Sequence, residues 1–401
     1  MPELIDWITS IDINNAVLYI KRLSANDTLA SNAHQAGPYI QKDILFHIFP
    51  ELNQRDQENP RINFNLYIPS HASEREVTAI WYNNKFRGGT RNEARITNFG
   101  GKSSVLLDPE STGALTIFYF DLSLQTPDCY VWVCRNELEE DIIEERFGII
   151  EPGKPYIYSP KQNQSFFDPP KKVSCWLEPT EIPKNWLSKF PSTQEIFDLV
   201  LQRCSKTGLN PDELLIKRRE CEFEMFRSLE LAIELPIIHT GFQDMESFLN
   251  KAQTILQRRK ARSGKSLELH VRQILTDEGL SEGKDFSYQP ESETNKRPDF
   301  IFPSEACYKD NTFDARNLRM LAVKTSCKDR WRQIINEADR IPVKHLFTLQ
   351  EGVSENQLNE MQSAGVRLVV PKSIIKKYPS NLQTRIQDFE SFIGDLRLLH
   401  L

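Results

Sequence analysis

Four ionisable residues in the second half of the chain have the types that phosphodiester cleavage needs. Asp299 opens a strand-like run, and Lys324 lies near the end of the next one. Glu337 follows inside a helix-like stretch, and Glu268 lies on a helix-like stretch that precedes them all. Two carboxylates can hold a divalent cation of the Mg²⁺ kind, which lowers the pKa of a bound water. A neighbouring lysine can orient that water and offset developing charge.

Lys324 is an unexpected residue in an apolar strand, because a buried ammonium group is costly unless a partner offsets its charge. The neighbouring carboxylates would supply that counter-charge. The alternative is a surface strand whose lysine reaches into water, with Glu337 solvated on an exposed helix face. Acid–lysine–acid sets at loose spacing are common, so spacing alone leaves both interpretations open.

The elements that must position these residues fall into two predicted domains. Residues 1–158 carry short β-type runs, typical of a small barrel or sandwich. Residues 159–186 contain many prolines and polar residues without a period, which predicts a linker. Residues 187–401 begin with helical apolar spacing and end with short strands between helices, which predicts an α/β domain.

Composition predicts a soluble globular protein. The chain has 401 residues, 26% of them charged, and no apolar run long enough to cross a membrane. The amino terminus lacks the basic-then-apolar order of a signal peptide, so a cytoplasmic location is expected. The seven cysteines include no C-x-x-C pair, which indicates neither a disulfide framework nor a zinc ribbon.

The net charge of −6 does not indicate a nucleic-acid binder, but binding requires only a local basic surface. Four local basic clusters occur, at residues 21–27, 85–95, 217–220 and 257–265. Each alone is most simply a solvated surface. The GKS sequence at 264–266 lacks the first glycine and the preceding strand of a phosphate-binding loop, so nucleotide binding is excluded.

Several long segments resemble the EcoRII-type restriction endonucleases, and together they span nearly the full length. These segments are LRMLAVKTSCKDRWRQIINEADR (318–340), HLFTLQEGVS (345–354), GVRLVVP (365–371), KKYP (376–379), YIKRLSANDT (19–28), TRNEARIT (90–97) and DPESTGALT (108–116). The resemblance implies a Mg²⁺-dependent enzyme that cuts double-stranded DNA, with a carboxy-terminal domain of the PD-(D/E)xK nuclease fold.

Carried over by position, Asp299 and Glu337 become metal ligands, Lys324 the catalytic lysine and Glu268 a further helical acid. The second acid of this family lies on the following helix rather than in the usual motif, and Glu337 fits that departure. The resemblance also implies that Lys328, Asp329 and Arg330 recognise G·C base pairs of the target DNA. Arginine and lysine donate to guanine, while aspartate accepts from cytosine. Alternatively, Asp329 caps a helix.

Arg219 and Phe223 are four residues apart on one predicted helix face. In the related enzymes an arginine and an aromatic residue sandwich a base flipped out of the duplex. Phe223 departs from the tyrosine expected there, and it is equally interpreted as a core residue.

The amino-terminal domain is similar to a DNA-binding pseudobarrel shared with plant transcription factors. The resemblance implies that it binds a second, effector copy of the site and covers the catalytic cleft until it does. Two recognition arms are expected to read base edges. The first arm contains Ser24, Asn26, Asp27 and His34, and the second contains Lys85, Arg91, Asn92, Glu93 and Arg95. Several of these residues could equally stabilise turns or cap helices.

The family implies a target of CC(A/T)GG, cleavage blocked by cytosine methylation, a homodimer formed through the carboxy-terminal domain, and a cytosine DNA methyltransferase as functional partner. The first alternative is a sequence-specific DNA-binding regulator without catalysis. The second is a nuclease for RNA or branched DNA, which the expected readers of duplex base edges disfavour.

Overall fold

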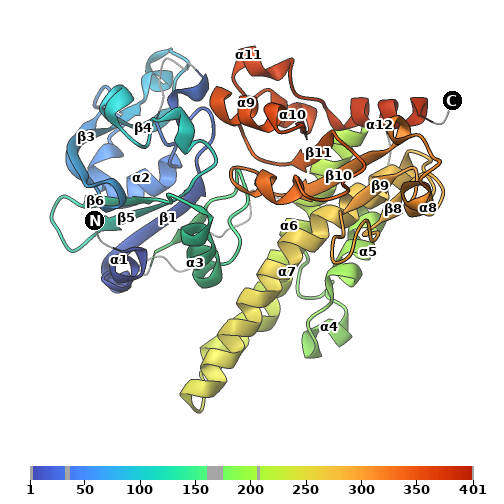
Figure 1. Ribbon diagram of the computed structural model, residues 1–401. Helices are drawn as coiled ribbons and strands as arrows, with labels where there is room; N and C mark the ends of the chain where they lie inside the picture. The colour runs from blue at the N-terminus through green and yellow to red at the C-terminus, as the bar shows by residue number, and fades with distance from the viewer. Residues whose placement is uncertain (1–2, 32–36, 160–174, 206–207, 400–401) are drawn as a thin grey trace. The chain divides into compact units, whose positions relative to one another are not determined.

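The computed structural model describes residues 3–31, 37–159, 175–205 and 208–399 (Figure 1). The chain forms two compact units. The first comprises residues 1–167 with the later segments 350–360 and 376–383, and the second comprises the remaining residues. Among the described residues, no helix combines the length and apolar character needed to cross a bilayer.

The first unit is built on one seven-stranded sheet with the order β4-β3-β2-β6-β5-β1-β7. Neighbouring strands are antiparallel except for the parallel pair β2 and β6. The strands are β1 (Ala16–Arg22), β2 (Arg61–Ile68), β3 (Ser73–Tyr82), β4 (Glu93–Thr97), β5 (Leu115–Asp121), β6 (Asp128–Val133) and β7 (Tyr156–Tyr158). The predicted β-rich character of this part is therefore confirmed.

Both faces of this sheet are covered, because successive residues of a strand point to opposite faces. Val17 and Tyr19 of β1 belong to one apolar core, and Leu18 and Ile20 belong to the other. The first core also contains side chains of α2 (Lys42–Ile48). The second contains side chains of α1 (Leu4–Thr9) and α3 (Glu137–Phe147).

Arg22, the last residue of β1, attaches α3 to the sheet through a buried ion network. Its guanidinium group donates to Glu140 and Glu144 of α3, each at 2.7 Å, and to the carbonyl oxygen of Ile150 at 2.9 Å. The basic side chain at this position is therefore structural. Lys21 beside it is paired with Asp27 at 2.7 Å.

The second unit contains a five-stranded sheet with the order β12-β11-β10-β9-β8. Strands β10, β11 and β12 are parallel neighbours, whereas β9 is antiparallel to both β10 and β8. The strands are β8 (Ser287–Tyr288), β9 (Phe300–Phe302), β10 (Arg319–Lys324), β11 (Lys344–Thr348) and β12 (Val366–Val369). This sheet with its helices confirms the predicted α/β composition.

Besides the short α4, three helices in the described part of this unit precede the sheet, and the last two of them are long and lie side by side (Figure 1). They are α5 (Thr193–Arg203), α6 (Pro211–Thr240) and α7 (Met245–Asp277). The remaining helices are α4 (Lys184–Ser188), α8 (Glu305–Lys309), α9 (Glu355–Ser363), α10 (Lys372–Ile375), α11 (Ser380–Gln383) and α12 (Phe389–Leu398).

Local sequence explains where α5, α6 and α7 begin. Ser192 and Glu195 form a capping box at the start of α5. Asn210 accepts from the amide of Glu213, and proline occupies the first position of α6. Asp244 caps α7 in the same way. These signals are local, which is why the helix starts are readable from the sequence.

The described end of the predicted linker is part of the second unit. Leu177, Ile182 and Trp186 are buried in one apolar cluster with residues of α5 and α6. Residues 160–174 lie outside the described chain. The absence of a regular period in residues 175–186 reflects irregular backbone rather than lack of packing.

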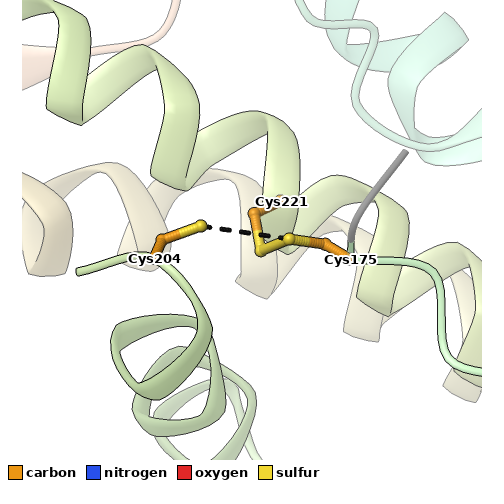
Figure 2. A group of neighbouring side chains, drawn as sticks. All are labelled: Cys175, Cys204 and Cys221. Atoms are coloured by element: carbon orange, nitrogen blue, oxygen red, sulfur yellow. Dashed lines mark hydrogen bonds between the residues drawn. A yellow bond between two sulfur atoms is a disulfide. The ribbon is translucent and has the colours of Figure 1, made fainter. Parts of the chain in front are cut away.

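The cysteine spacing indicated no disulfide framework, and it gave no sign of the single disulfide that the described residues contain. Cys175 and Cys221 are joined by a disulfide that spans 46 residues of sequence, and Cys204 lies beside it (Figure 2). The pairing depends on tertiary structure, which brings Cys175 of the predicted linker against α6. No local spacing motif reports a contact of this kind.

Candidate functional site

Asp299 lies at the junction of three elements of the second sheet. It directly precedes β9, and its carboxylate accepts from the backbone amide of Val323 in β10 at 2.7 Å. Its carbonyl oxygen accepts from the amide of Gln289, just after β8, at 2.8 Å. The carboxylate is thereby held at the end of β10, where Lys324 is the last residue.

Lys324 and the acids influence one another electrostatically. Burial raises the pKa of Asp299 to about 6, Lys324 opposes the shift, and the charges of Glu268 and Glu337 add to it. Burial likewise raises the pKa of Glu337, again opposed by Lys324. All four predicted catalytic residues are thus close enough to interact. The counter-charge expected for the strand lysine is present.

The predicted helix around Glu337 is wrong. A short 3₁₀ helix covers Arg330–Ile334, and Glu337 lies beyond it among turns. Its amide donates to the carbonyl oxygen of Ile334 at 3.1 Å. Ala338 has the left-handed φ of 49°, and its carbonyl oxygen accepts from the buried ammonium group of Lys344 at 2.7 Å. Lys344 therefore stabilises the turn that presents Glu337.

Glu268 on α7 is held by side chains that the sequence did not single out. Its carboxylate accepts from the hydroxyl of Tyr288 at 2.8 Å and from the side-chain amide of Gln289 at 2.9 Å. The ammonium group of Lys265 donates to the same hydroxyl at 2.7 Å. Lys265 belongs to the GKS sequence, which lies inside α7 as a helix rather than as a phosphate-binding loop. The hydrogen bond between Tyr288 and Glu268 is a tertiary contact. The sequence therefore predicted the acid but not the tyrosine that holds it.

The donor set of this site suits a hard cation. Partly buried carboxylates with raised pKa values carry unfavourable negative charge, which a divalent cation would offset. Within the described residues, the acids do not form a group of three with ligand oxygens all within 4.8 Å. Mg²⁺ normally keeps several waters and takes few protein ligands, so Asp299 and Glu337 would suffice.

A pocket opens beside Glu337 in the same unit. Its lining combines basic, amide and acidic side chains, namely Asn295, Lys296, Arg297, Gln333, Asn336 and Glu337. Lys296 is paired with Asp339 at 3.1 Å. Side chains of this kind are suited to contact phosphate and sugar oxygens next to the acids.

The predicted base-reading triplet follows β10, with Lys328 and Asp329 before the 3₁₀ helix and Arg330 as its first residue. Lys328, Asp329 and Arg330 are all partly exposed. Asp329 makes no side-chain capping bond, and its carboxylate instead accepts from Arg332 at 3.2 Å. The alternative role as a helix cap is therefore not supported.

Arg219 and Phe223 lie on α6, but in different environments. The guanidinium group of Arg219 is buried, where it donates to Glu222 at 3.1 Å and to the hydroxyl of Ser266. Glu222 also contacts the buried ring of His270 at 2.8 Å. Phe223 is partly buried and lies outside the apolar core cluster of these helices. Stacking of Arg219 on a base would require it to leave this network.

The first predicted effector arm contains an aspartate with a structural role. Asp27 is buried and accepts from the amide and hydroxyl of Ser24, at 2.7 and 2.8 Å, and from the amide of Tyr39 at 2.8 Å. Asn26 is exposed. His34 lies outside the described residues. Asp27 and Ser24 thus stabilise a turn that presents Asn26.

The second effector arm places charged side chains on β4. Glu93 pairs with Arg91 at 2.7 Å and Arg95 at 3.1 Å, and the hydrogen bond from Arg91 lowers the pKa of Glu93. Asn92 accepts from the indole of Trp81 at 2.9 Å, which is a structural role. Lys85 is exposed, and its amide bonds to the carbonyl oxygen of Arg91 at 3.0 Å.

The basic clusters of the second unit are largely neutralised by acidic partners. Arg218 pairs with Asp277 at 2.6 Å. Arg258 pairs with Glu234 at 2.6 Å, and Arg259 with Glu230 at 2.7 Å. The clusters at 217–220 and 257–265 therefore hold α6 and α7 together.

Comparisons with known proteins match both parts of the chain. The family model for the EcoRII C terminal matches residues 226–393. The model for the restriction endonuclease EcoRII, N-terminal, matches residues 12–163. The chain is 42% identical over 399 residues to the type II restriction enzyme EcoRII of Escherichia coli, covering 98% of this chain and 97% of that protein. It is 25% identical over 145 residues to the type II restriction enzyme SsoII of Shigella sonnei, covering 34% and 46%.

Solved structures with likeness to the chain include two bound to DNA. Metal-depleted Ecl18kI in complex with uncleaved, modified DNA matches with a TM-score of 0.44 and 19% identity, covering 56% of this chain and 85% of that one. The B3 domain of the UbaLAI restriction endonuclease with cognate DNA matches with a TM-score of 0.27 and 19% identity, covering 39% and 98%.

The relationship to the Escherichia coli enzyme extends over nearly the full length of both proteins, and both family models fall within it. The chain therefore belongs to the EcoRII family of type II restriction endonucleases, which are site-specific nucleases of double-stranded DNA.

Proposed function

We propose that cleavage depends on Mg²⁺ and that Asp299, Lys324 and Glu337 carry it, with Glu268 as a further acid. The observation that supports this is the environment of Asp299: burial raises its pKa to about 6, Lys324 opposes the shift, and the charges of Glu268 and Glu337 add to it. A partly buried carboxylate that is fixed by a backbone amide and lies near two other acids is suited to receive a cation.

Each residue has a distinct role in this proposal. Asp299 and Glu337 would hold the cation through their carboxylate oxygens. When bound, Mg²⁺ offsets charge on the scissile phosphate and lowers the pKa of a water. Lys324 orients the attacking water and offsets the charge that develops on the phosphate. Glu268 is oriented by Tyr288 and Gln289 toward the same cluster.

The direct test is cleavage of methyl-free plasmid DNA with and without Mg²⁺. The Asp299→Asn variant should lose double-strand cleavage while it retains site-specific binding in a gel-shift assay. Asp310→Asn is the matched control, because Asp310 is exposed and its carboxylate hydrogen-bonds locally to Thr312. Normal cutting by Asp299→Asn would disprove the assignment. Site-specific binding without cleavage by the unaltered protein would favour the DNA-binding regulator.

We also propose that the target is CC(A/T)GG and that its G·C pairs are read by Lys328, Asp329 and Arg330. Their partial exposure after β10, next to the catalytic lysine, supports this role.

Arg219 and Phe223 would enclose a flipped central base. Because Arg219 is paired with Glu222, this step requires a local rearrangement of α6 side chains.

The first unit is proposed to bind an effector copy of the site and to inhibit cleavage until that copy is bound. Support comes from the partly exposed set of Arg91, Glu93 and Arg95 at and just before β4, which offers both donors and acceptors to base edges. Addition of a short duplex containing the site should stimulate cleavage of a plasmid with a single site. Glu93→Gln should weaken that stimulation and leave catalysis of multi-site DNA measurable.

A homodimer formed through the second unit is proposed as the active form. The far end of the α6–α7 pair exposes large apolar side chains, namely Leu231, Ile237, Ile238, Met245, Phe248 and Leu249. Clustered exposed apolar residues commonly mark a protein interface.

A cytosine DNA methyltransferase would protect the host copies of the site, and both proteins would act in the cytoplasm.

A further inference from the structure

Three cysteine sulfur atoms meet in the apolar core formed by α5, α6 and the segment before α4 (Figure 2). Cys175 and Cys221 form a disulfide, and the Sγ atom of Cys204 lies 3.9 Å from that of Cys175. All three sulfur atoms lie within 4.8 Å of one another, and all three residues are buried. Cys204 is therefore in near contact with a bond that a thiol can exchange.

The three cysteines come from separate elements. Cys204 directly follows α5, Cys221 lies in α6, and Cys175 lies in the segment that precedes α4. Apolar side chains of the same cluster, including Ile196, Val200 and Met225, surround them. Cys204 and Cys221 thus approach Cys175 from two different elements.

We propose that Cys175, Cys204 and Cys221 form a thiol–disulfide exchange site in which Cys175 bonds alternately to Cys221 and to Cys204. The Cys204 thiolate attacks the sulfur of Cys175, a Cys175–Cys204 bond forms, and the Cys175–Cys221 bond breaks. Cys221 leaves as a thiolate and takes up the proton that Cys204 released. One disulfide and one thiol are present before and after, so no oxidant or reductant is consumed.

The geometry sets what the exchange requires. Attack proceeds along the axis of the disulfide, whereas the three sulfur atoms form a triangle (Figure 2). A rotation of the Cys204 side chain must therefore bring its sulfur onto that axis. The movement of sulfur that this requires is short, because the sulfur atoms already lie within 4.8 Å of one another.

The surrounding charges set the direction of the pH dependence. Burial raises the pKa of Cys204, Lys217 and Arg218 oppose the shift, and Glu224 adds to it. All three charged residues lie on α6. Because only the thiolate attacks, exchange should become faster as pH rises toward the pKa, by about tenfold per unit.

The simpler interpretation is that Cys204 is an inert core residue, since buried free cysteine behaves as a small apolar side chain. The two interpretations differ in the disulfides that they allow. An inert Cys204 leaves one pairing, whereas an exchanging Cys204 gives two pairings in equilibrium.

Disulfide mapping of the full-length protein tests this proposal. The reduced chain is first re-oxidised with glutathione disulfide at mildly acidic pH and then shifted to alkaline pH. Samples are quenched with acid at intervals and their free thiols are alkylated. The disulfide-linked peptides are then mapped by mass spectrometry without reduction. Both the Cys175–Cys221 and Cys175–Cys204 peptide pairs are expected. Their ratio should relax to a constant value, and the relaxation should be about tenfold faster per pH unit.

Cysteine variants distinguish disulfide exchange by Cys204 from mere closeness of its sulfur atom to the disulfide. Cys204→Ser should give only the Cys175–Cys221 pair and show no relaxation, and Cys221→Ser should give Cys175–Cys204. Cys307→Ser, which removes a partly buried cysteine elsewhere, should behave as the unaltered protein. The Cys175–Cys221 pair alone at every pH, or no disulfide after oxidation, would overturn the proposal. So would one equivalent of Zn²⁺ held by the three thiolates, because metal-bound thiolates do not form the disulfide.

Discussion

Asp299 and Glu268 depend on neighbouring groups for their orientation. A backbone amide of β10 fixes Asp299, and the hydroxyl of Tyr288 fixes Glu268. Residues that orient a metal-site acid commonly affect activity nearly as strongly as the acid itself. The proposed catalytic cluster therefore includes residues beyond those that would contact DNA or a cation.

Tyr288→Phe tests this dependence at the scale of one atom. Removal of the hydroxyl takes one hydrogen bond from Glu268 and leaves the bond from the side-chain amide of Gln289. The cleavage rate at saturating DNA should fall by about 10- to 100-fold, as is typical for loss of an orienting hydrogen bond at a metal site. DNA affinity without Mg²⁺ should be unchanged.

Tyr67→Phe is the matched control, because Tyr67 lies on β2 of the first unit and stacks on Tyr130. Its cleavage rate should equal that of the unaltered protein. A full cleavage rate in Tyr288→Phe would show that Glu268 needs no orientation by this hydroxyl.

The sequence revealed the residue types of the site but not their supports. Asp299 and Lys324 were found because each borders a strand with a clear apolar pattern. Tyr288, Gln289 and Lys344 were missed, because nothing in local spacing reports which side chain reaches across a fold. The pairing of Cys175 with Cys221 was missed for the same reason.

At the scale of elements, Asp212 near the start of α6 connects three helices. Its buried carboxylate accepts from the amides of Lys372 at 2.9 Å, Phe389 at 3.1 Å and Glu390 at 2.8 Å. These residues begin α10 and α12. One carboxylate thus satisfies amides at the first turns of two helices, which otherwise lack intrahelical partners.

Asp212→Asn should lower the free energy of unfolding by about 2 kcal/mol or more. The NH₂ group of asparagine is a donor and cannot accept from the backbone amides, and the hydrogen bonds to a charged carboxylate are lost. Denaturant unfolding followed by circular dichroism measures the change. Glu213→Gln, on the exposed side of the same turn, should alter stability little. Equal stabilities of the two variants would contradict the connecting role of Asp212.

His345 on β11 gives the second unit a pH-dependent stability. Burial lowers the pKa of this ring to about 4, and the charges of Arg319 and Arg367 act in the same direction. In the unfolded chain the ring takes up its proton near the usual histidine pKa of 6.5, before the folded chain does. Stability is therefore full above 6.5 and is lost as pH falls toward 4.

Between those pH values, the free energy of unfolding of the unaltered protein should fall by about 3 kcal/mol more than that of His345→Leu. Urea unfolding at several pH values measures the difference. His239→Leu, which changes an exposed histidine on α6, should keep the steep dependence. Parallel pH profiles for the unaltered protein and His345→Leu would refute this origin of acid sensitivity.

Element boundaries show why patterns succeed for some segments. The run at 319–325 was predicted as a strand, and β10 covers Arg319–Lys324. The spacing of 330–340 predicted a helix, but a 3₁₀ helix ends at Ile334 and Ala338 adopts a left-handed backbone. Short 3₁₀ and α segments share similar apolar spacing, so the sequence did not distinguish them.

At the scale of the whole molecule, the exposed apolar end of the α6–α7 pair predicts association between copies. Phe248 is 47% exposed there. Phe248→Lys should shift the protein from dimer to monomer in sedimentation velocity experiments, because a charge at a desolvated interface is costly. Leu398→Lys, at a 67% exposed position on α12, is the control and should remain dimeric. An unchanged dimer in Phe248→Lys would place the interface elsewhere.

The two-unit organisation was only partly readable from the sequence. The change from β-type runs to helical spacing marked the division near residue 158. Segments 350–360 and 376–383 belong to the first unit by their contacts, although they lie far along the chain. Composition carries no signal for such long-range association.

Sequencing of cut DNA ends tests the central claim most directly. Methyl-free genomic DNA is digested with the full-length protein and Mg²⁺, beside Asp299→Asn, and every new end is mapped. Ends confined to CC(A/T)GG sites are expected for the unaltered protein, and no new ends are expected for the variant. Ends scattered without a common sequence, or identical end maps for both proteins, would contradict it.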